Sequence, residues 1–470
     1  MYYITTILAI ASVCHGLTYR NYALLHGMPR NDRELKFFND MVKLYNVTYW
    51  RRPGKVMGPV EFTISPYNYG ELMIDTYNTK IRFRTIMEDV QSAFDDQTIK
   101  RYFRHHLDSF NWDHYHSLDD IYNWLKDLSG AHPGELQMLH IGKSFENRDI
   151  FAVKLKLNKV KICKKRHRPK VIIEGGSHGR EWISPAVVTY MIHALLNANN
   201  SNSEELKLVA PMYDWYFVPV MNPDGYVYSQ THDRLWKKNR RGGYGVDLNR
   251  NFGILFGKQG ANTDKRNDEY CGKEPFSEPE SAAMATLARD NSFSLEYYLS
   301  FHAYGQYIIL PYSFSKMYED NYNSTKKLAE TMATKIFTKY QIQYKVGTNF
   351  DTQGYLASGV SADWVKRAIN VTHVATIMLP DTGVFGFALP TNQILPTCQA
   401  LMDGLLAFLD PPNPEDLLNR EVNRLEDVPK EDSLFDLLHY DDDSATVENY
   451  ASSRILIVCN VIVHIFSRFQ

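Results

Sequence analysis

The 470-residue sequence has no excess of charge of either sign. Its 52 Lys and Arg residues are matched by 54 Asp and Glu residues, which gives a formal net charge of -2. Domains that bind nucleic acid carry a clustered excess of basic residues, so this balance excludes DNA or RNA as an expected partner. Pro and Gly number only 20 and 26, too few for a fibrous or disordered chain. We therefore expect a globular protein.

Long hydrophobic runs are also missing, so the sequence predicts no membrane span. The apolar segments at residues 2–13 and 455–466 are both too short to cross a bilayer. The first is followed by small residues and is typical of a signal peptide that is removed on secretion, although no Lys or Arg precedes it. Four Asn-x-Ser/Thr sequons fit the same route, at Asn46, Asn199, Asn323 and Asn370. We expect a secreted, extracellular protein.

Cysteine is scarce, with five residues in the whole chain. Cys14 and Cys459 lie in the terminal segments, which leaves Cys163, Cys271 and Cys398 for the folded part. Three scattered cysteines do not define a disulfide framework. We expect them to be buried free thiols.

The chain divides into four segments by composition and patterning. We place them at residues 1–16, 17–104, 105–411 and 412–470. The third and largest alternates short strands and helices, which predicts an α/β fold with a largely parallel sheet. Its first helix is expected after Ser117, because a serine followed by two acidic residues is a typical helix start.

The second segment has the pattern of a small α/β module. A helix-like stretch at residues 32–45 and a strand-like run at 60–64 support this interpretation. Its polar end carries three basic residues, Lys100, Arg101 and Arg104. Exposed basic residues between two domains indicate either a plain linker or a site for an activating trypsin-like protease.

The last segment, residues 412–470, is acidic and ends in the short apolar run. A glycolipid-anchor signal near Ser444 or Ala451 is an alternative interpretation of this tail. Asn460 and His464 interrupt the apolar run and disfavour that alternative.

The strongest motif follows a predicted buried strand at residues 170–174. Two glycines form a turn, and His178 and Glu181 follow, three residues apart, before a helical run at 184–195. At this spacing an entering helical turn directs an imidazole and a carboxylate to one point, a workable pair of zinc ligands. The carboxyl end of a strand in an open α/β sheet is also the usual ligand site. Taken alone, however, the pattern more often reflects a surface His beside a Glu.

This motif resembles that of the zinc carboxypeptidases of the pancreatic A/B type, whose pattern is His-x-Arg-Glu-Trp after such a strand. Further matches follow in the family's order, at Trp236 and at residues 247–252, 300–304, 354–359 and 381–387. The resemblance covers residues 111–410, and the preceding module resembles the family's pro-domain.

The resemblance implies the family's architecture. The expected fold is a carboxypeptidase-like α/β fold, with a mixed, largely parallel central sheet and helices on both faces, preceded by a small α/β pro-domain. Residues 17–104 would be the pro-domain and activation linker, and 105–411 the zinc carboxypeptidase domain.

A catalytic zinc site is also implied by the resemblance. His178, Glu181 and His302 correspond to the family's three zinc ligands, with a fourth position left to water. Asp247 corresponds to the carboxylate that orients His178 through its other ring nitrogen. The expected cofactor is therefore zinc.

The resemblance further implies a site for the C-terminal residue of a peptide or protein. Asn249 and Arg250 match the clamp for the terminal carboxylate, and a guanidinium fork suits such a group. Arg180 and Tyr355 would complete this site. Ala362 stands where relatives selective for basic residues carry an acid, which predicts a neutral, apolar terminal side chain.

Two catalytic positions depart from the family. Lys237 follows Trp236 where the family has an arginine, and it keeps the charge but loses the planar fork, which weakens oxyanion stabilisation. Met378 occupies the position of the general-base glutamate, three residues before Asp381. A thioether cannot take up a proton from zinc-bound water, and general acid-base catalysis contributes about 10²–10⁴ in rate.

No glutamate close in sequence can replace the missing base, because none occurs between Glu330 and Glu415. Whether the chain is an enzyme is therefore open. Our first hypothesis is a secreted zinc-binding protein that recognises peptide C-termini with impaired hydrolysis. The alternatives are an active carboxypeptidase for neutral or apolar C-terminal residues, and a non-catalytic secreted structural or interaction protein.

Overall fold

The computed structural model describes residues 16–77, 79–97, 110–157 and 168–409. Residues 1–15 of the proposed signal segment, the basic residues from Lys100 to Arg104, and the tail lie outside these ranges. We call the described residues up to 97 the module and those from 110 the body. None of the helices in these ranges is both long and apolar enough to cross a bilayer.

The module contains a four-stranded antiparallel sheet with the order β2-β3-β1-β4. Its elements are β1 (Ala23–Gly27), α1 (Asp32–Tyr45), β2 (Thr48–Arg51), β3 (Val60–Ile64), α2 (Pro66–Tyr77), β4 (Phe83–Met87) and α3 (Val90–Asp95). Phe38, Met41 and Phe62 are buried in its core. The expected helix at 32–45 and strand at 60–64 are both present.

The body is built on an eight-stranded mixed sheet with the order β11-β10-β12-β9-β7-β8-β6-β5. The strands are β5 (Leu136–Lys143), β6 (Asp149–Leu155), β7 (Lys170–Glu174), β8 (Asp214–Val218), β9 (Leu295–Ala303), β10 (Tyr307–Ile309), β11 (Lys345–Gly347) and β12 (His373–Leu379). The central strands β12, β9, β7 and β8 run parallel to one another. The expectation of a mixed, largely parallel sheet is confirmed.

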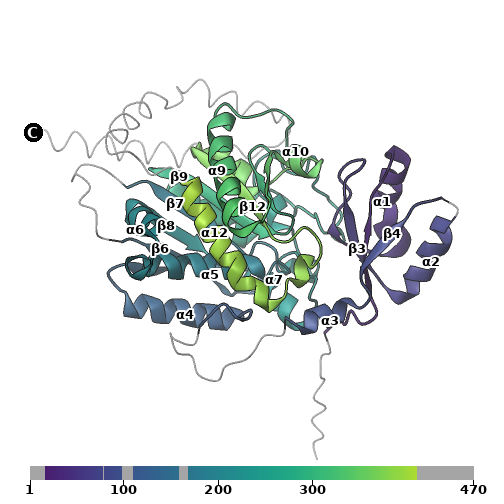
Figure 1. The fold of residues 1–470 in the computed structure, drawn as a ribbon, viewed down its shortest axis with the longest axis horizontal. Helices are drawn as coiled ribbons and strands as arrows, with labels where there is room; N and C mark the ends of the chain where they lie inside the picture. Colours follow the sequence, from purple (N-terminus) through teal and green to yellow (C-terminus); the bar gives the residue numbers. More distant parts are fainter. Residues whose placement is uncertain (1–15, 78, 98–109, 158–167, 410–470) are drawn as a thin grey trace, which may run out of the picture. The chain divides into compact units, whose positions relative to one another are not determined.

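Helices cover both faces of this sheet (Figure 1). They are α4 (Leu118–Ala131), α5 (Ile183–Leu196), α6 (Glu204–Val209), α7 (Pro223–Thr231), α8 (Pro279–Asp290), α9 (Tyr322–Tyr340), α10 (Asn349–Gln353), α11 (Ser361–Trp364) and α12 (Ile394–Phe408). Side chains alternate across a strand, so Val171 and Ile173 of β7 pack with α5 and α12, while Ile172 packs on the other side with α8.

Two expectations from the sequence are met in the body. Ser117 begins α4 by accepting a hydrogen bond from the backbone of Asp120, whose side chain accepts one from the backbone of Ser117 in return. Cys271 and Cys398 are buried free thiols, as expected, whereas Cys163 lies outside the described residues.

The parallel strands bring their carboxyl ends to one edge of the sheet. β7 ends four residues before His178, β9 contains His302, and β12 contains Met378. Ligands of open α/β sheets bind at this edge, because loops that leave neighbouring strands converge there. The topology therefore assembles residues that are more than a hundred positions apart in the sequence.

Candidate metal centre and its surroundings

Two histidines and one glutamate converge at the carboxyl ends of β7 and β9. Their ligand atoms all lie within 4.8 Å of one another, and all three residues are buried. Glu181 contacts both rings, with Oε1 at 2.7 Å from His178 Nδ1 and Oε2 at 2.9 Å from His302 Nδ1. Among the described residues this is the set of three that could hold a metal ion, and two imidazoles with a carboxylate suit zinc.

The local fold explains how His178 and Glu181 come together. Both lie in the tight turn between β7 and α5, and the backbone N–H of Glu181 donates to the carbonyl of His178 at 3.2 Å. Gly176 has a φ of +65°, and a Cβ there would lie 3.0 Å from the Val220 Cα. A residue with a side chain would therefore be strained at this turn.

Asp247 lies behind the cluster and contacts the far side of the His178 ring. Its Oδ1 is 3.0 Å from His178 Nε2, which leaves Nδ1 directed toward Glu181. Burial of Asp247 opposes ionisation, but the charges of Lys237 and His178 hold its pKa well below the usual value. An ionised carboxylate in this position fixes the orientation of the imidazole and increases its basicity as a metal ligand.

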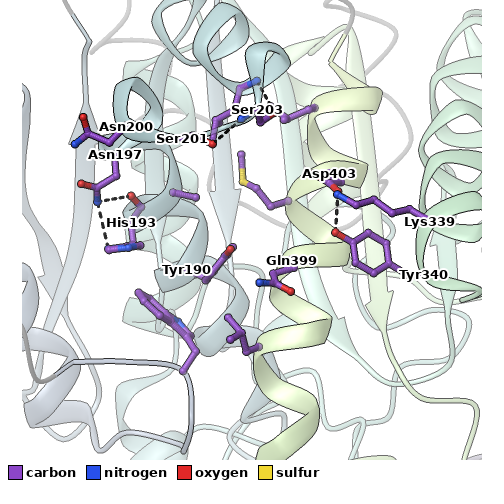
Figure 2. A pocket seen from close by; sticks show the side chains of 16 residues that line it. Tyr190, His193, Asn197, Asn200, Ser201, Ser203, Lys339, Tyr340, Gln399 and Asp403 are labelled. Carbon is purple, nitrogen blue, oxygen red and sulfur yellow. Dashed lines mark hydrogen bonds and ion pairs between the residues drawn. The ribbon is translucent and has the colours of Figure 1, made fainter.

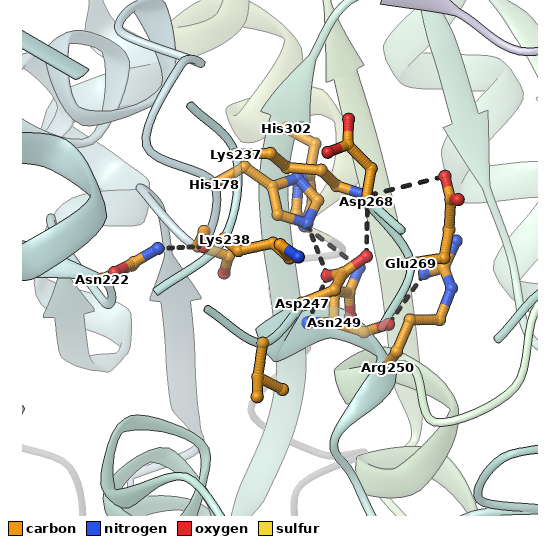
Figure 3. Close-up of polar contacts among 12 residues, drawn as sticks. His178, Asn222, Lys237, Lys238, Asp247, Asn249, Arg250, Asp268, Glu269 and His302 are labelled. Atoms are coloured by element: carbon orange, nitrogen blue, oxygen red, sulfur yellow. Dashed lines mark hydrogen bonds and ion pairs between the residues drawn. The ribbon is translucent and has the colours of Figure 1, made fainter. Parts of the chain in front are cut away.

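Lys237 is buried, and it contacts the same carboxylate. Its Nζ donates to Asp247 Oδ2 at 2.7 Å (Figure 3). The ammonium group therefore interacts primarily with the carboxylate that supports His178. Its next acidic neighbour is Glu269, whose Oε1 lies 4.0 Å from Nζ.

Asn249 and Arg250 lie beside the histidine pair on a short turn at Leu248–Arg250. Asn249 Oδ1 accepts the backbone N–H of Ser361 at 2.9 Å, and its Nδ2 lies 3.3 Å from His302 Nε2. Arg250 donates Nε to the carbonyl of Gly260 at 2.9 Å and Nη1 to the carbonyl of Asn249 at 2.8 Å. Backbone carbonyls thus hold the guanidinium in place.

Arg180 lies in the same turn as His178 and Glu181, but its side chain contacts other parts of the body. Its Nη1 is 3.3 Å from Asp268 Oδ2, and its guanidinium carbon lies 4.5 Å from the centre of the Phe387 ring. The structure therefore joins Arg180 to the loop that contains Asp268.

Ala362 lies on α11 in the core on the β7–α8 side of the sheet, and it is 2% exposed. The next residue, Asp363, was not singled out from the sequence. Its Oδ2 accepts the backbone N–H of Ser313 at 2.8 Å, and burial raises its pKa to about 7.

Met378 is half-buried on β12, in register with His302 of the parallel neighbour β9 and with Tyr307 of the antiparallel neighbour β10. The strand therefore brings the backbone of residue 378 next to that of a candidate metal ligand. A thioether in this place is at best a weak hydrogen-bond acceptor and exchanges no proton at neutral pH.

Two charged residues at this site were missed by sequence reasoning, Glu269 and Arg52. Arg52 directly follows β2 of the module, and its Nη1 lies 3.3 Å from Glu269 Oε1. Its guanidinium carbon also lies 5.2 Å from the centre of the Tyr355 ring. Glu269 stands in an irregular loop, and no pattern in the sequence pairs it with a residue more than two hundred positions away.

The module makes further contacts with the segments that follow β9 and β12. Arg51 Nη2 donates to the carbonyl of Thr382 at 2.9 Å, and the hydroxyl of Tyr304 donates to Glu61 Oε2 at 2.6 Å. A Cβ on Gly383 would lie only 2.2 Å from Glu61 Oε1. The module is therefore packed closely against the edge of the sheet at which the candidate metal centre lies.

A separate groove of about 660 Å³ lies between α5, α9 and α12 (Figure 2). Its polar lining includes His193 and Asn197 on one side and Gln399 and Asp403 on the other. None of the residues predicted from the sequence as metal, substrate or catalytic residues lines it, so it is distinct from the candidate metal centre.

Comparison with known proteins identifies the family. A model of zinc carboxypeptidases matches residues 121–404, and a model of carboxypeptidase activation peptides matches residues 28–97. This chain belongs to the zinc carboxypeptidase family. Zinc is the cofactor of this family, and the donor set of the buried cluster fits that ion.

Several known proteins resemble the chain over most of its length. Zinc carboxypeptidase A 1 of Anopheles gambiae is 32% identical over 83% of this chain and 90% of the relative. Carboxypeptidase B2 of Rattus norvegicus is 31% identical over 82% of this chain and 92% of the relative. The crystal structure of thrombin activatable fibrinolysis inhibitor superposes with a TM-score of 0.77 and 27% identity, covering 83% of this chain and 98% of that one.

Proposed function

We propose that this protein is a secreted, zinc-binding member of the carboxypeptidase family that recognises the C-terminal residues of peptides and hydrolyses them poorly. In the vocabulary of enzyme families it would be a pseudoenzyme, derived from a hydrolase and kept as a zymogen-like precursor. The observation that carries the proposal is the combination of a complete His, Glu and His cluster with Met378 on the adjacent strand.

The zinc ligands in this proposal are His178, Glu181 and His302. A zinc ion bound there would act as a Lewis acid and lower the pKa of a bound water to about 7. Asp247 would hold His178 in the tautomer that presents Nδ1 to the ion, consistent with its 3.0 Å contact to Nε2.

Peptide recognition in this proposal depends on Asn249 and Arg250. The guanidinium of Arg250 is held by two backbone carbonyls, so little conformational entropy is lost when it binds a terminal carboxylate. Tyr355 would lie along the bound peptide, Arg180 would border it, and Ala362 would favour a neutral, apolar terminal side chain.

Weak hydrolysis follows from two residues. Met378 provides no group to accept a proton from a water molecule or to pass it to the leaving amine. Lys237 is engaged with Asp247 at 2.7 Å, which reduces its capacity to stabilise an oxyanion. Together these features favour binding over turnover.

The precursor organisation belongs to the same proposal. The match to an activation peptide supports cleavage by a trypsin-like protease at Arg101 or Arg104. A cut after Arg104 would separate residues 17–104 from the zinc carboxypeptidase domain at 105–411. The route of secretion would use the signal segment at residues 1–16.

The decisive experiment measures zinc content and the release of C-terminal residues from blocked dipeptides, using the whole chain after trypsin treatment. We expect stoichiometric zinc, little turnover, and a gain of about 10²–10⁴ in rate for Met378→Glu. Met378→Gln is the matched control, because it has the shape of glutamate without its basicity. Turnover at ordinary enzyme rates by the unmodified chain would contradict the proposal.

A second candidate function is an active carboxypeptidase that uses another carboxylate as base. It is favoured by the complete His, Glu and His cluster and by the charge kept at Lys237, and the candidate base is Glu269, whose carboxylate lies 4.0 Å from Lys237 Nζ. Zinc-dependent turnover in the unmodified chain that is abolished by His178→Ala and by Glu269→Gln would establish this alternative.

A further inference from the structure

Arg52 of the module occupies a well-defined environment on the body. Its guanidinium lies between the Glu269 carboxylate, at 3.3 Å from Nη1, and the Tyr355 ring, at 5.2 Å from the guanidinium carbon. A carboxylate and an aromatic face are the two groups that proteins combine to bind a guanidinium or an ammonium ion. The carboxylate and the ring both belong to the body.

The approach of the module to this place is close. A Cβ on Gly54 would lie 2.3 Å from the carbonyl oxygen of Gln353 and 3.2 Å from Tyr355 Cδ1. The loop after β2 therefore lies directly on residues 353–355, with Arg52 at its start.

The other cations near Glu269 have partners of their own. Lys237 Nζ is 2.7 Å from Asp247 but 4.0 Å from Glu269, and Arg250 donates to two backbone carbonyls. Burial acts to raise the pKa of Glu269, but the charges of Arg52, then Lys237 and Arg250, hold it below the usual value. Removal of the module would take away the nearest cation of this carboxylate, whose side chain is 18% exposed while the module is in place.

We infer that Glu269 and the Tyr355 ring form a subsite for a basic side chain of a bound peptide, and that Arg52 fills this subsite in the whole chain. Arginine fits better than lysine, since its planar group can face the ring and pair with the carboxylate together. The presence of a cation subsite stands on the contacts of Arg52, whereas the identity of its occupant as a peptide rests on the proposed function.

The first test uses the whole chain and requires no peptide. Arg52→Ala empties the subsite, and ethylguanidinium is the probe, with ethylurea as its uncharged counterpart. We expect ethylguanidinium to raise the Tm of Arg52→Ala above the value in ethylurea, by about 1–2 °C at a concentration several times its Kd. The unmodified chain, with the subsite filled, should show no such difference.

Two further variants isolate the role of the carboxylate. Adding Glu269→Gln to Arg52→Ala should abolish the Tm difference between ethylguanidinium and ethylurea. Adding Glu274→Gln should preserve this Tm difference, because Glu274 is an exposed acid of the same loop. An equal response with and without Glu269→Gln would overturn the inference. Arg52→Ser replaces Arg52→Ala if the alanine variant does not fold.

The second test measures peptide affinity on the chain nicked by trypsin, with both fragments kept in solution and the trypsin then inhibited. Fluorescent peptides carry arginine or its neutral isostere citrulline at each of the last three positions. We expect the arginine form to bind about tenfold more tightly at one position, as is typical of a hydrogen-bonded ion pair. Glu269→Gln should remove this preference, and Glu274→Gln should not.

The two tests separate the two proposals. If no peptide binds but ethylguanidinium still distinguishes Arg52→Ala from the double variant, the proposed function fails and the cation subsite stands. Peptide binding without a preference for arginine at any of the three positions would overturn the basic side chain as its occupant.

Discussion

Asp363 is a buried carboxyl group that retains its proton at higher pH than an ordinary aspartate. Burial raises its pKa from 3.8 to about 7, while the backbone N–H of Ser313 works to lower it. Between these two values the folded protein binds more protons here than the unfolded chain does. The contribution of Asp363 to the free energy of unfolding therefore falls as the pH rises through this range, and it levels off above about 7.

Asp363→Asn tests this sign. The amide keeps an oxygen for the Ser313 N–H but does not ionise, so this pH-dependent loss of stability should vanish. We expect the Tm of the variant to rise relative to that of the unmodified chain between about pH 5 and pH 8. For the control Asp290→Asn, at the exposed end of α8, the Tm difference from the unmodified chain should not change with pH over this range. A constant Tm difference for Asp363→Asn would contradict the assigned pKa shift.

Some individual residues of the candidate site could be predicted from the sequence, whereas others could not, and the reasons are physical. His178 and Glu181 are three positions apart, so their convergence follows from local geometry, and His302 followed from the family resemblance. Arg52 and Glu269 meet only because the module packs on the body. Long-range contacts of this kind leave no periodic signal in a single sequence.

The loop between β2 and β3 is the element that brings Arg52 to the body. Gly54 in this loop has no room for a side chain, because its Cβ would lie 2.3 Å from the carbonyl oxygen of Gln353. The obstacle is the backbone of the body, so an added methyl group must displace the loop.

We expect Gly54→Ala to loosen the contact of this loop with the body without unfolding the module. Amide hydrogen exchange at residues 353–355 should become faster, because this contact shields the segment in the whole chain. Gly70→Ala is the matched control. Gly70 lies in α2 of the module, and a Cβ at this position would contact nothing within 4 Å. Equal exchange rates in the two variants would mean that the loop does not protect these residues.

Elements were easier to predict than the contacts among them. Ser117 and Asp120 identified the start of α4, since a capping box uses only neighbouring residues. Alternation of strands and helices predicted the parallel centre of the sheet. The place of β10, antiparallel to β12 and parallel to β11, depends on pairing partners that are distant in sequence, and the chain gave no local indication of it.

Across the whole molecule, a metal ion at the candidate centre would connect the turn after β7 to β9. A ligand that binds only the folded state stabilises it by about 2.7 kcal/mol when its concentration is a hundred times its Kd. We therefore expect a zinc chelator to lower the Tm of the chain by several degrees and added zinc to restore it.

The control for this prediction is a chain that cannot bind the ion. His302→Ala should already have the lower Tm and should respond to neither chelator nor zinc, whereas His140→Ala, at a partly exposed site on β5, should respond like the unmodified chain. Insensitivity of the unmodified chain to chelation would argue against a bound zinc ion.

Arg52 fills the subsite formed by Glu269 and Tyr355, so a basic side chain of a peptide must compete with it for this subsite. While the module and the body share one unbroken chain, the segment that links them sets the effective concentration of Arg52 at the subsite. This effective concentration does not depend on the concentration of the protein. After cleavage of the linking segment, Arg52 belongs to a separate fragment, and the fraction of subsites that it occupies falls with dilution. A basic peptide would then displace the severed module readily in a dilute solution of the protein and poorly in a concentrated one, so the same cleavage would have different effects at the two concentrations.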